Sequence, residues 1–517
     1  MKSPVEEVTT TNTFDESEIG TNLKGRAVRG GMLTMIGQFA TRVVQIGGTM
    51  VLARILTPDN YGLYAMIVVV TGFMLIFQDL GLSMASVQRE SITHEQINAL
   101  FWIGLGASAV VMLVVMALGP ALVWFYGEPQ LLWLTTAISV GFLFGGLAIQ
   151  PKAVLKRQMK FGALAGLNIA ALTLSIVVGI GTAWAGAGVW ALVYMELARN
   201  FFTMVIVWIM CPWRPSLSIS LRGRGVGSML AFGGNLTGFN IVNYFARSLD
   251  RVLIGKFCES GQLGLYSKAY QLMMLPILQV SAPIGDVAIP TLSRLQNDPR
   301  RLRNYYLKAI MFIAFVTMPG VMFMVVMAEE IIGAVLGSQW TGASRIFAIL
   351  GLSALIQPLY NTQGWLHVSV GKTDRALRWG IVGSAAIIAS FIIGIRFGVI
   401  GVATCYTVVI YLLIGPCLWY AGRPIELKLS QITSVVWKIF IASIGAGFIC
   451  KYLVDFTGIS NPWARIGLGL PFFLCVYVIS LLVLHQSLSP LKDILNLLHH
   501  NTSAEAAGKK GKSLSGV

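Results

Sequence analysis

The chain has 517 residues, of which 56% are hydrophobic and 12% are charged, about half the charged share of a soluble domain. Its net charge of +16 would indicate a nucleic-acid ligand in a soluble protein, but a chain this apolar uses lipid as its solvent. The composition therefore excludes an ordinary soluble enzyme and a soluble nucleic-acid-binding protein.

Apolar runs of membrane-spanning length, roughly 20 residues each, follow an acidic start that is rich in Ser and Thr. We predict fourteen of them: 31–56, 62–85, 98–120, 131–150, 163–184, 187–210, 228–256, 264–290, 306–328, 341–364, 379–396, 399–420, 433–454 and 464–485. Lipid cannot satisfy backbone hydrogen bonds, and unbroken apolar runs exclude a barrel, so each span is expected to be a helix. The predicted fold class is an all-α, polytopic membrane protein.

Lys and Arg are concentrated in alternate connections between the predicted spans. Both tails and the connections 151–162, 211–227, 291–308 and 365–378 carry 23 of them, whereas the opposite connections carry only a few, such as Arg345, Arg396, Lys451 and Arg465. The positive-inside rule places the basic side, and with it both termini, in the cytoplasm. Aromatic residues near span ends are typical of interfacial belts: Trp124, Tyr126, Trp184, Trp208, Trp213 and Trp463.

One short sequence occurs twice, since Gly62-Leu63-Tyr64 returns 202 positions later as Gly264-Leu265-Tyr266. Six predicted spans separate the two copies, so both have the same orientation and define two parallel six-helix lobes. Each copy is expected in the outer hairpin between the first two helices of its lobe, with Pro58, Asp59 and Gly261 forming the turns. The predicted domains are a disordered cytoplasmic tail at 1–24, an N-lobe at 25–222, a C-lobe at 223–424, two further helices at 425–487 and a cytoplasmic tail at 488–517.

Polar residues recur at helical spacing in the first helix of each lobe. The N-lobe carries Gln38, Arg42, Gln45 and Thr49, and the C-lobe carries Asn240, Asn243, Arg247, Asp250 and Arg251. At the same shift of 202 positions, Gln38 meets Asn240 and Gln45 meets Arg247. This common register argues against a chance recurrence of the short repeat.

A charge at the centre of a bilayer costs about 2.5–3.5 kcal/mol, so the charged residues of these stripes must face protein or water. One interpretation is an intrahelical pair of Arg247 and Asp250, which leaves other arginines unpaired. The other is a water-filled cavity with a cationic wall for an anionic substrate, because guanidinium groups fit phosphate oxygens. The candidate substrate-binding residues are Arg42, Arg247, Arg251, Lys268, Gln38, Gln45, Asn240 and Asn243.

Four acidic residues lie within or near spans and are candidates for coupling transport to an ion: Asp250, Asp79, Glu196 and Asp286. Asp79 and Glu196 have an equally supported local interpretation as a cap or a pair, for example Glu196 with Arg199. The sequence contains no catalytic motif, and its dispersed cysteines and histidines predict no metal site. Gly371-Lys372-Thr373 lacks the earlier glycine of a phosphate-binding loop, because position 366 is Leu366. The glycine-rich run GFLFGG at 141–146 predicts close helix contact rather than a ligand site.

Several longer strings resemble the Wzx-like polysaccharide transporter family of the multidrug/oligosaccharidyl-lipid/polysaccharide (MOP) exporter superfamily, in its colanic acid and exopolysaccharide subgroup. They are VLARILTPDNYGLYAM (51–66), DLGLSMASVQRESITHEQINALFW (79–102), LKRQMKFGALA (155–165), GAGVWALV (186–193), ARSLDRVLIGKFCESGQLGLYSKAYQLMMLPI (246–277) and IPTLSRLQNDPRRLRNYY (289–306). The resemblance extends from about residue 25 to about residue 310, and beyond that it rests on hydropathy.

The resemblance implies two six-helix bundles, two additional helices and a central cavity. It implies a flippase in the bacterial inner membrane that turns an undecaprenyl-pyrophosphate-linked oligosaccharide from the cytoplasmic to the periplasmic leaflet. It also implies coupling to H+ or Na+ without a bound cofactor, contact with membrane lipids, and a polysaccharide polymerase and chain-length regulator as partners.

Two other functions compete with that of a flippase. A cation-coupled exporter of drugs or metabolites on the same fold would place more acids than bases in its cavity, the reverse of the bias in this sequence. A membrane-embedded polymerase or ligase would need large outer loops, and no predicted outer connection exceeds roughly 15 residues. A flippase is therefore the expected function, and an enzyme is not expected.

Overall fold

The computed structural model of the protein describes residues 23–79, 93–216, 244 and 248–485. Within these ranges the regular elements are all helices, which confirms the predicted all-α class. The chain divides into two compact units, and the boundary lies inside one helix, between Gly264 and Leu265. The division into lobes at 222/223 stays a prediction, as do the tails at 1–24 and 488–517, which lie almost wholly outside the described residues.

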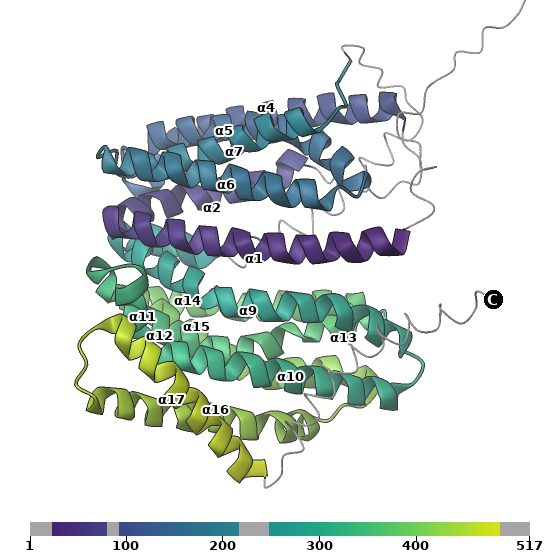
Figure 1. The fold of residues 1–517 in the computed structure, drawn as a ribbon, viewed down its shortest axis with the longest axis vertical. Helices are drawn as coiled ribbons and strands as arrows, with labels where there is room; N and C mark the ends of the chain where they lie inside the picture. Colours follow the sequence, from purple (N-terminus) through teal and green to yellow (C-terminus); the bar gives the residue numbers. More distant parts are fainter. Residues whose placement is uncertain (1–22, 80–92, 217–243, 245–247, 486–517) are drawn as a thin grey trace, which may run out of the picture. The chain divides into compact units, whose positions relative to one another are not determined.

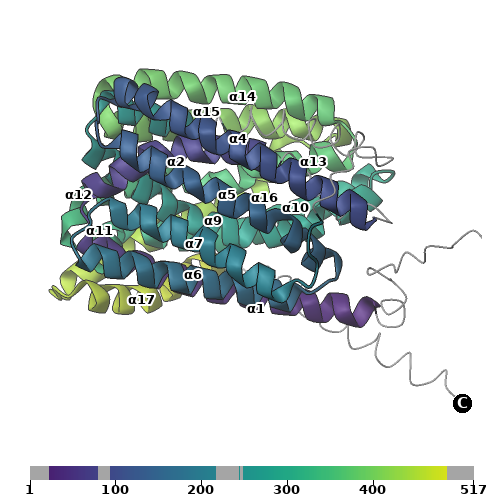
Figure 2. The ribbon, with the colours of Figure 1, turned by 90° about the horizontal axis from the view of Figure 1, so that it is seen from above.

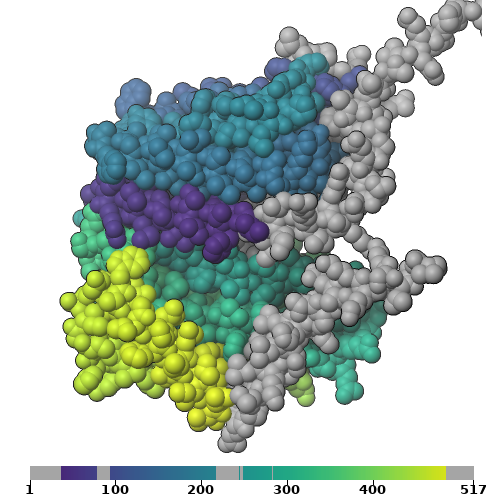
Figure 3. All heavy atoms as spheres, in the orientation of Figure 1, coloured from purple at the N-terminus to yellow at the C-terminus, as the bar shows by residue number. Residues whose placement is uncertain are grey.

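The first unit is a bundle of long helices (Figures 1 and 2). They are α1 (Leu23–Ile55), α2 (Pro58–Asp79), α4 (His94–Tyr126), α5 (Leu131–Arg157), α6 (Phe161–Trp184) and α7 (Trp190–Met210), followed by helical residues at 248–257. Within the bundle α5 packs against α4 and α7, while α6 packs against α1 and α7. α2 packs against α4 and α5, and Figure 3 shows α1, in purple, on the surface of this unit.

The second unit begins within α9. Its elements are α9 (Ser260–Arg294), α10 (Pro299–Val326), α11 (Ala328–Val335), η2 (Ser338–Trp340), α12 (Thr341–Asn361), α13 (Gln363–Ser369), α14 (Thr373–Gly394), η3 (Ile395–Phe397), α15 (Gly398–Gly422), η4 (Arg423–Ile425), α16 (Leu429–Phe456) and α17 (Pro462–His485). α10 packs against α12 and α16, and α15 packs against α12 and α14. α16 and α17 form a hairpin, and α17, in yellow, lies on the surface in Figure 3.

Eleven stretches of the described residues are helical, long and apolar enough to cross a membrane. One of them, Thr373–Ile425, contains both α14 and α15. These stretches correspond to twelve of the fourteen predicted spans, and the other two, 31–56 and 228–256, stay predictions. The protein is therefore a multi-pass membrane protein.

Local sequence explains where several helices begin. Pro58 opens α2, where a residue without an amide N–H costs nothing because the first amides of a helix lack intrahelical acceptors. Before α4, Thr93 Oγ1 accepts a hydrogen bond from the Gln96 amide at 3.3 Å, and the Thr93 amide donates to Gln96 Oε1 at 3.1 Å. The prediction that Pro58, Asp59 and Gly261 form turns was wrong, because all three belong to the first turns of α2 and α9.

An aromatic cluster closes one end of the first unit. Trp213 is 6% exposed and packs edge-on against Phe101, with ring centroids 5.6 Å apart. The chain after α7 folds back over it, since Trp102 Nε1 donates to the Ser216 carbonyl and Asn98 Oδ1 accepts from the Ser216 amide, both at 2.9 Å. The prediction that Trp213 lies at the lipid interface was therefore wrong. Among the other predicted belt residues, Trp124, Trp184 and Trp463 are exposed at helix ends.

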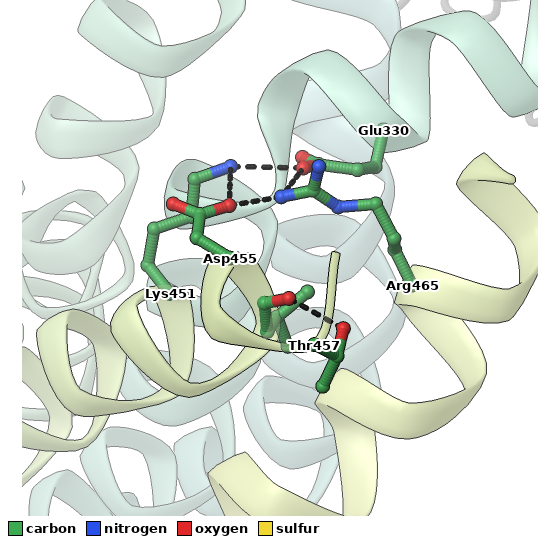
Figure 4. Close-up of polar contacts among 6 residues, drawn as sticks. Glu330, Lys451, Asp455, Thr457 and Arg465 are labelled. Carbon is green, nitrogen blue, oxygen red and sulfur yellow. Dashed lines mark hydrogen bonds and ion pairs between the residues drawn. The ribbon is translucent and has the colours of Figure 1, made fainter. Parts of the chain in front are cut away.

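An ion network holds the α16–α17 hairpin to α11 (Figure 4). Glu330 Oε1 lies 2.8 Å from Lys451 Nζ and 3.0 Å from Arg465 Nη2, and Asp455 pairs with both cations. Glu330 is 6% exposed, so its charge depends on these cations rather than on water. Lys451 and Arg465 belong to the few basic residues predicted on the outer side, and this network gives them a structural role.

Candidate substrate-binding site

The predicted polar stripe of the first helix is partly organised by its own side chains. Arg42 and Gln45 are three residues apart on α1, so they share a helix face, and Arg42 Nη1 donates to Gln45 Oε1 at 2.9 Å. An amide oxygen carries no charge, so this contact orients the guanidinium without neutralising it. Gln38 is exposed, while Arg42 and Gln45 are partly buried.

The helix that ends at residue 257 packs against α2. The hydroxyl of Tyr244 donates to the Val69 carbonyl at 2.6 Å, and its ring lies 5.9 Å from that of Phe73. The Tyr244 side chain also lies beside Ser248 and within electrostatic range of Arg251. Arg251 therefore lies close to a tyrosine that is anchored to α2.

Asp250 is buried and engages its neighbour Arg251. Its Oδ1 accepts a hydrogen bond from the Arg251 amide at 2.8 Å and lies 3.9 Å from Arg251 Nε. The Arg251 side chain keeps 26% of its surface exposed, so part of it is accessible to a ligand although it lies beside Asp250. The pair of Arg247 with Asp250 considered above involves Arg247, which lies outside the described residues, as do Asn240 and Asn243.

Lys268 is buried on α9 in the second unit, and its Nζ donates to Gln271 Oε1 at 3.2 Å. Gln271 lies three residues further on the same helix, which repeats the cation–amide arrangement of Arg42 and Gln45 on α1. Because Lys268 belongs to a different unit from Arg42 and Arg251, their convergence on one cavity stays a prediction.

The acidic candidates occupy different environments. Asp286 is exposed on α9, whereas Glu196 is partly buried on α7. Within the described residues Glu196 makes no ion pair with Arg199, so the local pairing considered from the sequence does not occur. The side chain of Asp79 lies outside the described residues. The choice among these four acids as the coupling site stays a prediction.

The described candidate residues favour anion recognition. Arg42, Arg251 and Lys268 supply charged N–H donors, and forked guanidinium groups bind phosphate or carboxylate oxygens in pairs. No three His, Cys, Asp or Glu side chains of the described residues gather into a metal-ligating group. Tyr244 was not predicted, although its spacing of seven residues from Arg251 places it on the same helix face and would have indicated it.

Known proteins match both the sequence and the fold. Residues 51–345, more than half of the chain, match the family described as polysaccharide biosynthesis protein. The teichuronic acid biosynthesis protein TuaB of Bacillus subtilis (strain 168) is 25% identical over 81% of this chain and 87% of its own. The lipopolysaccharide biosynthesis protein WzxC of Escherichia coli (strain K12) is 22% identical over 69% of this chain and 73% of its own.

Among solved structures, the lipid II flippase MurJ in an inward closed conformation superimposes with a TM-score of 0.70. The superposition covers 88% of this chain and 99% of MurJ at 14% sequence identity, so it shows a common fold. The sequence match and the fold agree with the resemblance described above. The chain belongs to the polysaccharide biosynthesis protein family.

Proposed function

We propose that this protein is a flippase for a lipid-linked oligosaccharide, the undecaprenyl-pyrophosphate-linked repeat unit of a bacterial exopolysaccharide or lipopolysaccharide. The substrate moves from the cytoplasmic to the periplasmic leaflet of the inner membrane by alternating access between two lobes. Both termini lie in the cytoplasm, as the distribution of Lys and Arg indicates. The protein is a transporter and carries out no covalent step.

The main support for this proposal is membership of the polysaccharide biosynthesis protein family, whose match covers residues 51–345 and includes Arg251 and Lys268. These cations lie on helices of a membrane protein, with Arg251 Nε 3.9 Å from Asp250 Oδ1 and Lys268 Nζ 3.2 Å from Gln271 Oε1. A pyrophosphate offers the oxygens that such donors bind best. An H+ or Na+ gradient supplies the driving force, with Asp250, Asp79, Glu196 and Asp286 as coupling candidates, and a polymerase and a chain-length regulator act downstream.

The direct test is transport by the purified protein in proteoliposomes, with a fluorescent oligosaccharide on a polyprenyl pyrophosphate as substrate. We expect the wild type to move the label across the bilayer and the double variant Arg247→Ala/Arg251→Ala to lose transport while keeping its membrane abundance. Arg345→Ala is a matched control, because Arg345 is an exposed arginine at the opposite, outer side of the predicted topology. Normal transport by the double variant would contradict the site assignment.

If the wild type moves an organic cation and leaves the lipid-linked sugar in place, the alternative of a cation-coupled exporter replaces this proposal. The same vesicles, loaded with either substrate, distinguish the two functions. Collapse of the H+ gradient and of the Na+ gradient in separate reactions then identifies the coupling ion.

A further inference from the structure

A buried histidine of the second unit takes part in none of the contacts described so far. His367 belongs to the short helix α13, which packs against α12, α14 and α15. It is 1% exposed, and neither of its ring nitrogens has a hydrogen-bond partner among the described residues. A neutral imidazole carries one donor and one acceptor, so burial of both without a protein partner is unfavourable. Such a position needs a reason other than stability.

Arg375 and Trp379 fasten the start of α14 to the end of α15. Arg375 Nη2 donates to the Tyr420 carbonyl at 2.6 Å, and the guanidinium carbon lies 4.2 Å from the centroid of the Tyr420 ring. Trp379 stacks on the same ring with centroids 5.9 Å apart, and its Nε1 donates to the Tyr360 hydroxyl of α12 at 3.2 Å. We refer to these contacts of Arg375 and Trp379 with Tyr420 and Tyr360 as the α14 latch.

His367 lies against the centre of the α14 latch. Its ring centroid is 5.9 Å from that of Tyr420, so His367 and Arg375 both lie next to the same aromatic ring. The His367 carbonyl also accepts a hydrogen bond from the Lys372 amide at 2.8 Å, which ties α13 to the turn before α14. A proton bound to His367 would therefore add a second positive charge beside the Tyr420 ring.

The surroundings of His367 offer an imidazolium little compensation. The charged and titratable side chains near it are Tyr360 of α12, Lys372, Asp374, Arg375 and Arg378 at the start of α14, and Cys417 and Tyr420 of α15. The carboxylate of Asp374 is exposed and lies 3.9 Å from Arg378, so water and Arg378 screen its charge. Gln363 Oε1, one turn earlier on α13, is a buried acceptor without a partner among the described residues, but it carries no full charge. The closed latch therefore fits a neutral His367.

We infer that His367 is a proton-binding residue of the transport cycle and that binding of a proton opens the α14 latch. This inference rests on the proposed function, in which an ion gradient drives transport, and it adds a base to the four acidic coupling candidates. One proton passes from water to the unprotonated ring nitrogen, and both nitrogens are then donors. The imidazolium repels Arg375 and gains hydration when α13 and the start of α14 move away from α15. Protonation and opening therefore favour each other.

Hydrogen–deuterium exchange of the purified full-length protein tests the latch. Residues 370–379 contain the amides of the turn before α14 and of its first turns. After correction for the intrinsic rate, their exchange should be about tenfold faster at pH 5.5 than at pH 7.5, because an exposed histidine has a pKa of about 6.5 and each pH unit below it shifts the opening equilibrium about tenfold. Peptides of α16, in the same unit, are the internal reference and should show no such increase.

Two variants separate the titration of His367 from other effects of pH. His367→Gln cannot take up a proton at this position, so residues 370–379 should exchange at the same corrected rate at both pH values. His94→Gln is the matched control, because it removes an exposed histidine from α4 of the first unit, and it should keep the wild-type response.

An undiminished response to pH in a folded His367→Gln variant would overturn the inference. So would a wild type in which residues 370–379 and the peptides of α16 respond to pH alike. The second comparison needs no variant, so it decides the question even if His367→Gln does not fold.

Transport in proteoliposomes tests the coupling role and distinguishes it from the function on which it rests. We expect the wild type to transport faster with an H+ gradient than without one, and His367→Gln to transport at one rate in both conditions. If the wild type moves no lipid-linked oligosaccharide, the proposed function fails, whereas the exchange measurements still decide whether a proton opens the latch. If the wild type transports but responds only to Na+, or if His367→Gln responds to the H+ gradient as the wild type does, only the coupling role of His367 is rejected.

Discussion

Gly62 of α2 and Gly264 of α9 occupy reciprocal positions where the first turns of the two helices cross. A Cβ on Gly62 would lie 1.7 Å from the Ser260 carbonyl oxygen, and a Cβ on Gly264 would lie 2.0 Å from the Pro58 carbonyl oxygen. Pro58 and Ser260 are themselves 202 positions apart, as are the two glycines. The sequence repeat therefore corresponds to a pair of equivalent contacts, and neither position has room for a side chain.

Replacing either glycine with alanine should destabilise the protein. The added methyl group meets backbone atoms, which cannot rotate away. Gly62→Ala and Gly264→Ala should therefore each lower the free energy of unfolding by about 2 kcal/mol. The loss is measured as a fall in the thermal unfolding temperature in detergent. Gly106→Ala in α4 is the control, because a Cβ there meets no atom within 4 Å and alanine is the better helix former. Equal unfolding temperatures for Gly62→Ala and Gly106→Ala would contradict the tight crossing.

A disulfide across this crossing should arrest transport. Ser260 Oγ donates to Asp59 Oδ1 at 3.0 Å, so Asp59→Cys and Ser260→Cys place two thiols within reach of each other. The proposed alternating access would separate the two predicted outer hairpins, so oxidation should stop transport and reduction should restore it. The experiment needs Cys258→Ser in addition, because that native thiol is two residues from Ser260. The single variants under the same oxidant are the controls, and undiminished transport in fully cross-linked protein would contradict opening at this end.

Neutralising Glu330 should loosen the α16–α17 hairpin. Glu330→Gln leaves Lys451 and Arg465 without their buried acidic partner. Because both cations are partly exposed and therefore partly screened by water, the free energy of unfolding should fall by only about 2 kcal/mol. The measurement is again the thermal unfolding temperature. Asp374→Asn is the control, since its pair with Arg378 is 3.9 Å long and mostly exposed, and such pairs contribute roughly 0–1 kcal/mol. If both variants unfold alike, the network does not hold the hairpin.

Hydropathy was enough to predict the helical class and the repeated membrane spans, because lipid imposes both on any chain that crosses it. The repeat at Gly62 and Gly264 was equally visible. The contact between the two copies was not visible in the sequence, because a spacing along the chain contains no information about which helices touch. The same limit applies to Glu330: its partners Lys451 and Arg465 follow it by more than a hundred residues.

Side-chain roles near span ends were harder to predict than the spans. Lys152 was assigned to a connection because hydropathy falls there, yet α5 extends to Arg157 and includes this lysine. Trp213 was assigned to the interface by its residue type, but the chain beyond α7 folds back and buries it. Both depend on tertiary packing, which a hydropathy pattern does not encode.

Chemical labelling of the Cys258 thiol tests the predicted topology. Cys258 lies in the connection before α9, which the positive-inside rule places on the outer side. Burial, together with the neighbouring Glu259 carboxylate, raises the pKa of the Cys258 thiol. A raised pKa leaves less thiolate at neutral pH than in an ordinary cysteine, so labelling should be slow there and increase about tenfold per pH unit while the pH is below the pKa.

We therefore expect a variant that keeps only Cys258 to react with a membrane-impermeant maleimide in intact cells, faster at pH 8 than at pH 7. Glu259→Gln should react faster than its parent at pH 7, because it removes the charge that disfavours the thiolate. Cys258→Ser on the same background should take up no label. Reaction confined to inverted vesicles would reverse the predicted orientation, whereas a rate independent of pH would contradict the raised pKa and leave the orientation intact.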